Sequence, residues 1–594
     1  MSSATPHRLP LAGTLRLGRP SDIWFKPALS VLAAVAPPNL TLLALGHLDL
    51  AMYTMAGSLC ALYAHNRPYA ARARALAWLV LGMVGGLAVA LLTASLTSDA
   101  VVLVTVGALM AAVQKTVCDA TRIGPPGHVV LAFISTASLF VPQTLDQVPG
   151  HIGLALAAGA WAWLIGMAPG LLRPHGPERR ATAQALNAAA AYAETRGTGE
   201  GHARARAATA AAVHTAWQSL LAAEPRPHST RPRSTRPGSI RPYGAQPRNT
   251  GPHGTRPDRP RPEGTRPDPT RRALERLLVR AEVALAAPAD TDPERLRGWA
   301  RALRGTGRVP EAGPPQDTSD ELLGVDAELA LPRRPLRHRL APLAPIAVRT
   351  ATGCALAGYA SLALGVGRPY WALVTAASLY QANVTLTWSR SIQRVVGNLL
   401  GVLVFAAVAP FAHLHPAALV LCCVALNFGA EALIGRNYWL GSVCVTPMAL
   451  LITEFARTQD PGRLITERVA DTLIGALVGF VAAVAVTNRR AGDRIEHALT
   501  AVERAREHAA RLLAAPCPSS RALEAARRAL AAALVDLRVT ADAASGEWWQ
   551  RALPTERVVL AEQSGHRTLA ATVRRQGLAP LAQDAGRTTE DIRP

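Results

Sequence analysis

Apolar and polar residues separate into large zones along the chain. Residues 28–172 and 343–487 are strongly apolar, whereas residues 173–342 and 488–594 are rich in Arg, Pro, Ala and Glu, and residues 1–27 form a basic lead-in. Zones that differ this much in polarity call for two solvents, lipid and water. The pattern predicts an all-α polytopic membrane protein with polar helical segments outside the bilayer.

Each apolar zone divides into runs that approach the roughly 20 residues needed by a bilayer-spanning helix. The runs lie near residues 28–46, 49–65, 75–95, 100–118, 128–142 and 151–172, and near 344–365, 369–386, 392–411, 416–434, 438–455 and 468–487. We therefore expect two repeats of about six transmembrane helices. Because six is even, both copies would enter the membrane from the same side and form a parallel repeat.

The placement of Lys and Arg orients these helices. With the N-terminus inside, the loops expected in the cytoplasm carry Arg67, Arg72, Arg74, Lys115 and Arg122. The loops expected outside, residues 97–99 and 142–150, contain neither Lys nor Arg. The first zone thus follows the positive-inside rule, which predicts a plasma membrane protein with both termini in the cytoplasm.

The second zone follows this rule less well. Arg457, Arg463 and Arg468 fall on the expected outside, offset by Glu454, Asp460 and Glu467. A miscounted span would explain these charges, and so would a functional charge cluster. We favour the functional cluster.

The polar zones predict water-exposed helices around a linker. Residues 225–272 consist almost entirely of Pro, Arg, Gly, Ser and Thr, and such a segment cannot bury enough apolar surface to offset its chain entropy. We expect a disordered linker there, within a cytoplasmic helical insert at 173–342. Apolar residues recur at three and four positions in residues 488–594, which predicts a second cytoplasmic helical region.

Overall composition narrows the possible partners. The formal net charge is +22, but the positive residues lie outside the apolar zones, where the positive-inside rule explains them, so we expect no nucleic-acid partner. The seven cysteines show no Cys-x-x-Cys spacing, and we expect no metal and no cofactor. Membrane lipid is the expected partner, and a homo-oligomer is compatible with the sequence.

The chain lacks the motifs of soluble enzymes. It contains no GxxxxGK[ST], HExxH, GxSxG or strand-linked GxGxxG sequence. We therefore expect no enzymatic activity. A solute moved by such a chain would draw on an ion gradient or on its own gradient.

Ionisable residues within membrane helices are costly and are therefore functional candidates. An Arg side chain can hold a carboxylate by paired hydrogen bonds, and a buried carboxyl group can take up and release a coupling proton. The candidates for substrate binding are Arg349, Arg394, Asn398, Asn427 and Arg468, and those for proton coupling are Glu431 and Asp471.

Each candidate also has a purely structural interpretation. Arg349 and Arg394, near predicted helix starts, could snorkel to the interface. Arg468 and Asp471 could form an ion pair at a helix end, and a short tenth span would leave Glu431 at the cytoplasmic face. The asparagines could simply bond to neighbouring helices.

Several motifs of the second zone resemble the fusaric acid resistance, or aromatic acid exporter, family. They are Arg349 with its Ala/Gly-rich helix, Arg368-Pro-Tyr-Trp371, Arg394-Val-Val-Gly397-Asn-Leu-Leu-Gly401, and Glu467-Arg468-Val-Ala-Asp471-Thr-Leu-Ile-Gly475. Asn398 stands where the family typically has Thr. The resemblance covers about 150 residues well, and the first zone shares layout more than residues.

The resemblance implies a proton-driven exporter of small aromatic or other organic anions. Many family members that must cross two outer layers work with a periplasmic adaptor, and nothing in this sequence indicates one. Two other functions remain open: a passive organic-anion channel, and a non-transporting membrane scaffold or envelope-stress protein whose cytoplasmic helices recruit partners.

Overall fold

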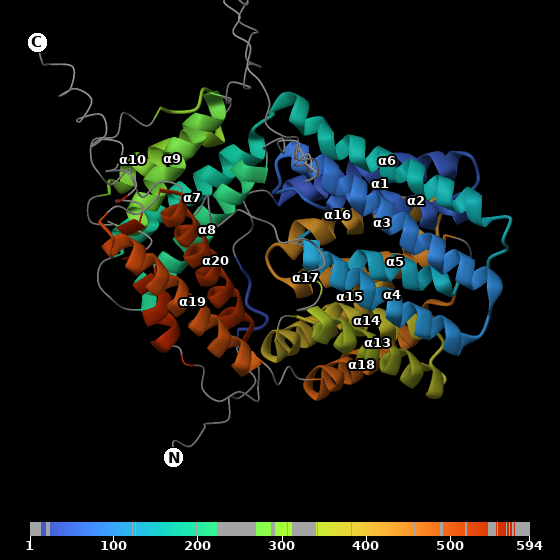
Figure 1. Cartoon of the computed structure of the whole chain (residues 1–594). Coiled ribbons are helices and arrows are strands. Elements are labelled where there is room, and N and C mark those ends of the chain that lie inside the picture. Colours follow the sequence, from blue (N-terminus) through green and yellow to red (C-terminus); the bar gives the residue numbers. More distant parts are fainter. Residues whose placement is uncertain are drawn as a thin grey trace, which may run out of the picture. The chain divides into compact units, whose positions relative to one another are not determined.

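The computed structural model confirms an all-α chain (Figure 1). The structure describes residues 13–18, 24–121, 123–124, 126–195, 200–222, 269–286, 291–305, 307–311, 340, 343–381, 383–455, 459–486, 491–516, 520–544 and parts of 554–575. The chain divides into two compact units, Met1–Pro177 with Asp317–Pro594, and Glu178–Gln316.

Each apolar zone forms six helical segments of similar order. In the first zone these are α1 (Phe25–Ala44), α2 (Ala51–Ser58) continued by η2 (Leu59–Leu62), α3 (Tyr69–Leu96), α4 (Ala100–Thr121), α5 (Val129–Leu139) and α6 (Val148–Leu172). In the second they are α13 (Ala344–Ala363), α14 (Pro369–Leu379), α15 (Val384–Ala412), α16 (Pro416–Ile434), α17 (Tyr438–Thr453) and α18 (Pro461–Ala485).

Seven of the described helices are long and apolar enough to cross a membrane: α1, α3, α4, α6, α15, α16 and α18. The predicted twelve spans are therefore not shown: α2, α5, α14 and α17 have at most 16 residues each, and α13 is not among the seven. Large apolar side chains on the long helices are exposed, among them Leu81, Leu164 and Leu403. Such surfaces suit contact with lipid tails.

The short helices are the most enclosed parts of the two zones. Every residue of α14 is buried, and α14 packs against α13, α18, α5, α4 and α15. A helix of 11 residues spans only about 16 Å, about half of the hydrocarbon core. Its ends expose backbone polar groups that lipid cannot satisfy, so a short helix at this depth must be surrounded by protein.

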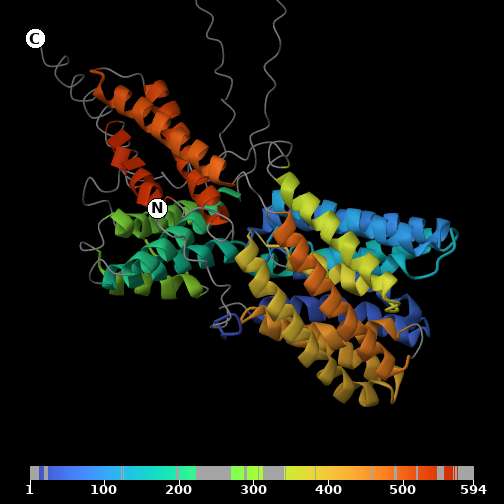
Figure 2. The ribbon, with the colours of Figure 1, turned by 90° about the horizontal axis from the view of Figure 1, so that it is seen from below.

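The two zones interlock through matching helix pairs (Figure 2). Within the first zone α6 packs on α2 and α3, and within the second α18 packs on α14 and α15. The two zones meet where α1 packs on α16 and α4 packs on α13. Each zone therefore contacts the other through the first and fourth of its six helical segments.

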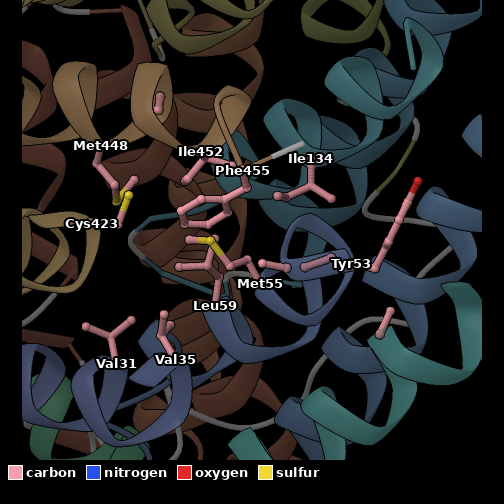
Figure 3. Packing of buried hydrophobic residues seen from close by; sticks show 14 of the residues in the cluster. Val31, Val35, Tyr53, Met55, Leu59, Ile134, Cys423, Met448, Ile452 and Phe455 are labelled. Atoms are coloured by element: carbon pink, nitrogen blue, oxygen red, sulfur yellow. The ribbon is translucent and has the colours of Figure 1, made fainter. Parts of the chain in front are cut away.

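A shared hydrophobic core joins the zones (Figure 3). Val31, Met55 and Ile134 from the first zone lie in one buried cluster with Cys423 and Ile452 from the second. Because lipid tails are as apolar as these side chains, close van der Waals packing stabilises the junction where it lies within the membrane.

The polar zones are helical where the structure describes them. The unit Glu178–Gln316 contains α7 (Gly176–Glu194, from its third residue), α8 (Glu200–Ala222), α9 (Pro269–Ala286) and α10 (Pro293–Arg304). Because α9 begins at Pro269, the last four residues of the predicted linker are helical; its residues 225–268 lie outside the described ranges. Near the C-terminus, α19 (Ala491–Ala514) and α20 (Ser520–Ala544) pack on each other.

A buried arginine cluster as candidate functional site

Arg468 lies inside the second zone, two turns from the start of α18. Its side chain is 1% exposed, and its guanidinium carbon stands 3.9 Å from the centroid of the Trp371 ring. Arg468 Nη2 donates a hydrogen bond to Asn398 Oδ1 at 2.9 Å. The sequence placed Arg468 at a helix start because the apolar run begins there, but α18 starts at Pro461, and the preceding turns carry the polar residues of the helix end.

Asn398 connects Arg468 to two other helices. Its Oδ1 also accepts a hydrogen bond from Thr446 Oγ1 of α17 at 2.6 Å, and its Nδ2 donates to the Arg394 carbonyl one turn earlier on α15. Arg394 Nη1 in turn donates to the Tyr438 hydroxyl at 3.1 Å. Trp371, Arg394, Asn398, Tyr438, Thr446 and Arg468 form what we call the arginine cluster.

Helix periodicity explains how α15 presents its part of the cluster. Thr387, Ser391, Arg394, Asn398 and Gly401 are all buried and recur at spacings of four and three residues, which places them on one face. Because α15 begins at Val384, Arg394 lies in the third turn and is buried, not at the helix start where it could snorkel.

Asp471 lies one turn beyond Arg468 on α18, and the two do not form the ion pair that their spacing allows. Asp471 is fully buried and its Oδ1 accepts a hydrogen bond from Ser361 Oγ at 2.6 Å. Asp471 Oδ2, Arg468 Nε and Arg468 Nη1 are buried without hydrogen-bond partners, and all three belong to described residues. The acid and the base therefore face different partners.

The N-terminal end of α18 carries a separate ion-pair network. Arg368 Nε lies 2.9 Å from Glu467 Oε2, and Arg463 Nε lies 2.7 Å from Glu467 Oε1. Arg368 also donates to the Gln459 side chain. Both arginines of this network therefore have a carboxylate partner, unlike Arg394 and Arg468, which form no ion pair with any described residue.

The arginine cluster carries excess positive charge. Arg394 and Arg468 are both buried and repel each other electrostatically, and Arg394 Nε, like the two Arg468 nitrogens, has no hydrogen-bond partner. Removing a guanidinium from water costs several kcal/mol unless a counter-charge and hydrogen bonds compensate. The arrangement therefore favours a bound anion, and a carboxylate matches the fork of the guanidinium.

A small, mostly apolar cavity lies where the four short helices meet. It is lined by Met52, Met55, Phe133, Ile134, Ala137, Tyr370, Ile452 and Thr453. Two of the lining rings contact Trp371: Phe133 stacks on it at 5.5 Å between centroids, and Tyr370 lies at 4.9 Å. Trp371 therefore links the cavity wall to the Arg468 guanidinium.

Arg349 has a different environment from the other predicted arginines. It is buried, and its Nε and Nη2 donate to the Val486 carbonyl at 3.1 and 2.9 Å, at the C-terminal end of α18. A guanidinium in this position satisfies an orphan carbonyl and opposes the negative end of the helix dipole. It does not join the arginine cluster.

Asn427 and Glu431 also lie apart from the cluster. They share a face of α16, which packs on α1, and Glu431 interacts electrostatically with Tyr63 of the first zone. Neither side chain forms a hydrogen bond with any described residue of the arginine cluster, and Asn427 Nδ2 is buried without a partner. The structure thus brings together Arg394, Asn398 and Arg468 of the predicted substrate-binding residues.

Two hydroxyl residues near these charges were not predicted from the sequence: Thr446 of the arginine cluster, and Ser361, which bonds Asp471. Both lie in apolar helices, where hydroxyl side chains usually bond only to their own backbone. One signal was present: Tyr438, Ser442 and Thr446 recur every four residues and so share one face of α17.

The fold and this site define a class: a multi-pass, all-α membrane protein whose second zone buries arginines able to hold an anion. Comparison with known proteins agrees with the resemblance noted above. Residues 355–482 match the family described as fusaric acid resistance protein-like. This segment contains α14 to α17, the C-terminal part of α13, most of α18, and every residue of the arginine cluster.

A relative and the solved structures add little beyond this class. Over 139 residues the chain is 31% identical to a protein named uncharacterized membrane protein YvaC from Bacillus subtilis (strain 168). The match covers 23% of this chain and 22% of that protein, so the chain spans about a fifth of the relative's length. No solved structure matches the chain.

Proposed function

We propose that this protein is a membrane transporter that exports small aromatic or other organic anions, with Arg468 as the principal anion-binding residue. The observation that carries the proposal is the Arg468 guanidinium, which is 1% exposed and, among the described residues, makes one hydrogen bond, to a neutral amide. An incoming carboxylate would supply the missing counter-charge and accept from the unpartnered Nε and Nη1. Asn398 holds the guanidinium in place, and Arg394 adds positive potential.

The surroundings of Arg468 favour an acid with an aromatic or other apolar body. Trp371 stacks on the guanidinium, and Phe133 and Tyr370 extend these rings to the apolar cavity. Ring stacking and apolar burial would select such a body, while the guanidinium selects its carboxylate.

Asp471 is the residue that we assign to proton coupling. It is a buried carboxyl group one turn from Arg468, bonded through one oxygen to Ser361, and its other oxygen has no partner. A carboxyl group in this position can exchange a proton as the anion binds and leaves. Glu431 lies outside the cluster, so we give it no part in this step.

The proposal includes a repeated architecture of two six-helix halves in the plasma membrane, with both termini in the cytoplasm. The matched contacts support it: α2 with α6 and α14 with α18, α3 with α5 and α15 with α17, and the exchanged pairs α1 with α16 and α4 with α13. In this arrangement the first half supports the site and the second half forms it.

The test is uptake of labelled benzoate into inverted membrane vesicles, with and without an imposed proton gradient. We expect gradient-dependent accumulation that an uncoupler abolishes, and Arg468→Gln lowers uptake at least about tenfold because a charged hydrogen-bonding pair is lost. Arg463→Gln is the matched control, since this arginine of the same helix is 76% exposed and should transport normally.

The other outcomes have defined meanings. Asp471→Asn should abolish accumulation but leave downhill flux. Equilibration of the native protein without accumulation would favour a passive channel. Normal uptake by Arg468→Gln would refute the assignment of the site, and absence of flux for a panel of acids would favour a scaffold.

A further inference from the structure

Residues 13–18 form a short segment that lies against α15 and the start of α17. The segment turns on itself, since Arg16 N donates to Gly13 O at 3.2 Å, and Gly13 has a positive φ of 90° that suits glycine. From here it reaches a surface more than 370 residues further along the chain.

Side chains of this surface recognise the backbone carbonyls of the segment. Gln393 Nε2 donates to Thr14 O at 2.8 Å. Asn437 Nδ2 donates to Thr14 O at 3.2 Å and to Arg16 O at 3.0 Å, and Trp439 Nε1 donates to Leu15 O at 3.2 Å. A backbone bond from Gly18 N to Arg436 O at 2.9 Å completes the attachment.

The attachment depends little on burial of apolar side chains. Of the six residues only Thr14 is buried, at 9% exposure, whereas Leu17 is 57% exposed. A segment held by a few backbone hydrogen bonds and no apolar anchor opens far more readily than a core element.

The segment meets the arginine cluster at its Arg394–Tyr438 end. Gln393 directly precedes Arg394, and Asn437 and Trp439 flank Tyr438, which accepts the Arg394 hydrogen bond. Arg390, one turn earlier on α15, stacks on the Tyr438 ring at 3.7 Å. The residues that hold the segment therefore alternate with the residues that form this end of the cluster.

We propose that residues 13–18 are a releasable strap that closes the Arg394–Tyr438 end of the arginine cluster. Bound, the strap blocks access from that end; released, it opens access along the polar face of α15. The inference rests on the proposed function only in taking the cluster as a solute path, and its test needs no transported solute.

The strap is tested first by thiol labelling of its own residues. In the full chain, Thr14→Cys should react slowly with an impermeant maleimide and Leu17→Cys quickly. Combining Thr14→Cys with Gln393→Glu and Asn437→Asp should raise its rate about tenfold, because two amide donors become carbonyl-repelling acceptors. Asp at 437 keeps the oxygen that caps the Trp439 N–H, so α17 still begins normally.

Access to the cluster is tested by a second reporter, Ser391→Cys, on the buried face of α15. Its reaction with a small anionic methanethiosulfonate should rise by a similar factor when the strap is released. Gly18→Ala repeats the release without touching the helices, since its Cβ would lie 2.9 Å from Arg436 O. Two results would overturn the proposal. One is rapid labelling of Thr14→Cys in a chain whose strap contacts are otherwise unchanged. The other is release of the strap that leaves Ser391→Cys unreactive.

Discussion

Two buried arginines are expected to have opposite effects on the stability of the fold: Arg349 stabilises it and Arg468 destabilises it. Arg349 satisfies the Val486 carbonyl at a helix end, whereas Arg468 is buried with two nitrogens unpartnered. The first arrangement is a finished structural contact. The second leaves a costly buried charge, which the proposed function assigns to a bound anion.

Substitution of the two arginines should therefore separate stability from binding. Arg349→Gln should lower the free energy of unfolding by about 1–3 kcal/mol, because a buried carbonyl loses its donors. Arg468→Gln should unfold at the same or a higher temperature in the absence of ligand, because a costly buried charge is removed. Thermal unfolding of the purified protein measures both.

Ligand addition completes this comparison. Benzoate should raise the unfolding temperature of the native protein and of Arg349→Gln, but not of Arg468→Gln, because binding to the native state adds to stability. Marked destabilisation by Arg468→Gln without ligand would mean that Arg468 is a structural residue, and the anion site would lie elsewhere.

Sequence reasoning placed the candidate residues in the second zone, but it did not predict how deeply the structure buries them. It identified Arg394, Asn398, Arg468 and Asp471 as candidates, because polar and ionisable residues in apolar runs are conspicuous. It could not distinguish Arg349 from Arg468, since each opens an apolar run. Whether an arginine caps a helix or faces a ring depends on contacts between α13, α14 and α18, which local pattern does not encode.

At the scale of the helix, close packing of α15 on α17 positions the cluster. A Cβ atom added to Gly401 would lie 2.6 Å from Thr446 Cβ, so only glycine allows this approach. The polar contact between Asn398 and Thr446 depends on the same close approach of the two helices.

In α3, by contrast, the three glycines Gly82, Gly85 and Gly86 are mostly unpacked. A Cβ added to Gly82 or Gly85 would meet nothing within 4 Å, and of the three only Gly86 lies against neighbouring side chains.

These glycines give a matched pair of substitutions. Gly401→Ala should destabilise the protein by about 1–3 kcal/mol through overpacking and should weaken benzoate binding. Gly82→Ala should be neutral or stabilising by up to about 1 kcal/mol, because alanine favours the helix and meets no neighbour. Thermal unfolding and a binding titration distinguish them; equal effects would show that helix propensity, not the α15–α17 contact, controls position 401.

Helix boundaries were the least predictable features at this scale. The apolar run near 392–411 and the run near 468–487 correspond to α15 and α18, but both helices begin seven or eight residues earlier, within polar sequence. A hydropathy pattern marks the part of a helix that faces lipid. It cannot mark turns whose polar side chains are satisfied by other residues of the protein, as Glu467 of α18 is by Arg368.

At the scale of the whole molecule, the site and the polar unit Glu178–Gln316 are built from separate residues. The contacts described for the arginine cluster are all between residues of the other unit. The unit Glu178–Gln316 has contacts of its own, such as the Arg179 guanidinium on the Gly307 carbonyl at 2.8 Å and the ion pair of Arg297 with Glu194.

Removal of this unit should therefore leave the site intact. A chain in which a flexible linker replaces residues 178–316 should bind benzoate with the affinity of the full chain, measured by the shift in unfolding temperature. Its partner-dependent functions, if any, would be lost. Loss of binding in a deletion protein that still folds would show that the polar unit completes the site, and would strengthen the scaffold alternative.

The packing of α1 on α16 and of α4 on α13 also has a consequence for the order of assembly during synthesis, because the partners are far apart in the chain. Helix α1 ends at Ala44, but its partner α16 begins at Pro416, a delay of roughly 20–70 s at about 5–20 residues per second of synthesis. The surface of α1 that packs on α16 stays uncovered until then, and the surface of α4 that packs on α13 stays uncovered until α13 is made from Ala344 onward. A ribosome that stalls within the polar insert would release a half-built bundle, the kind of product that cellular proteases remove.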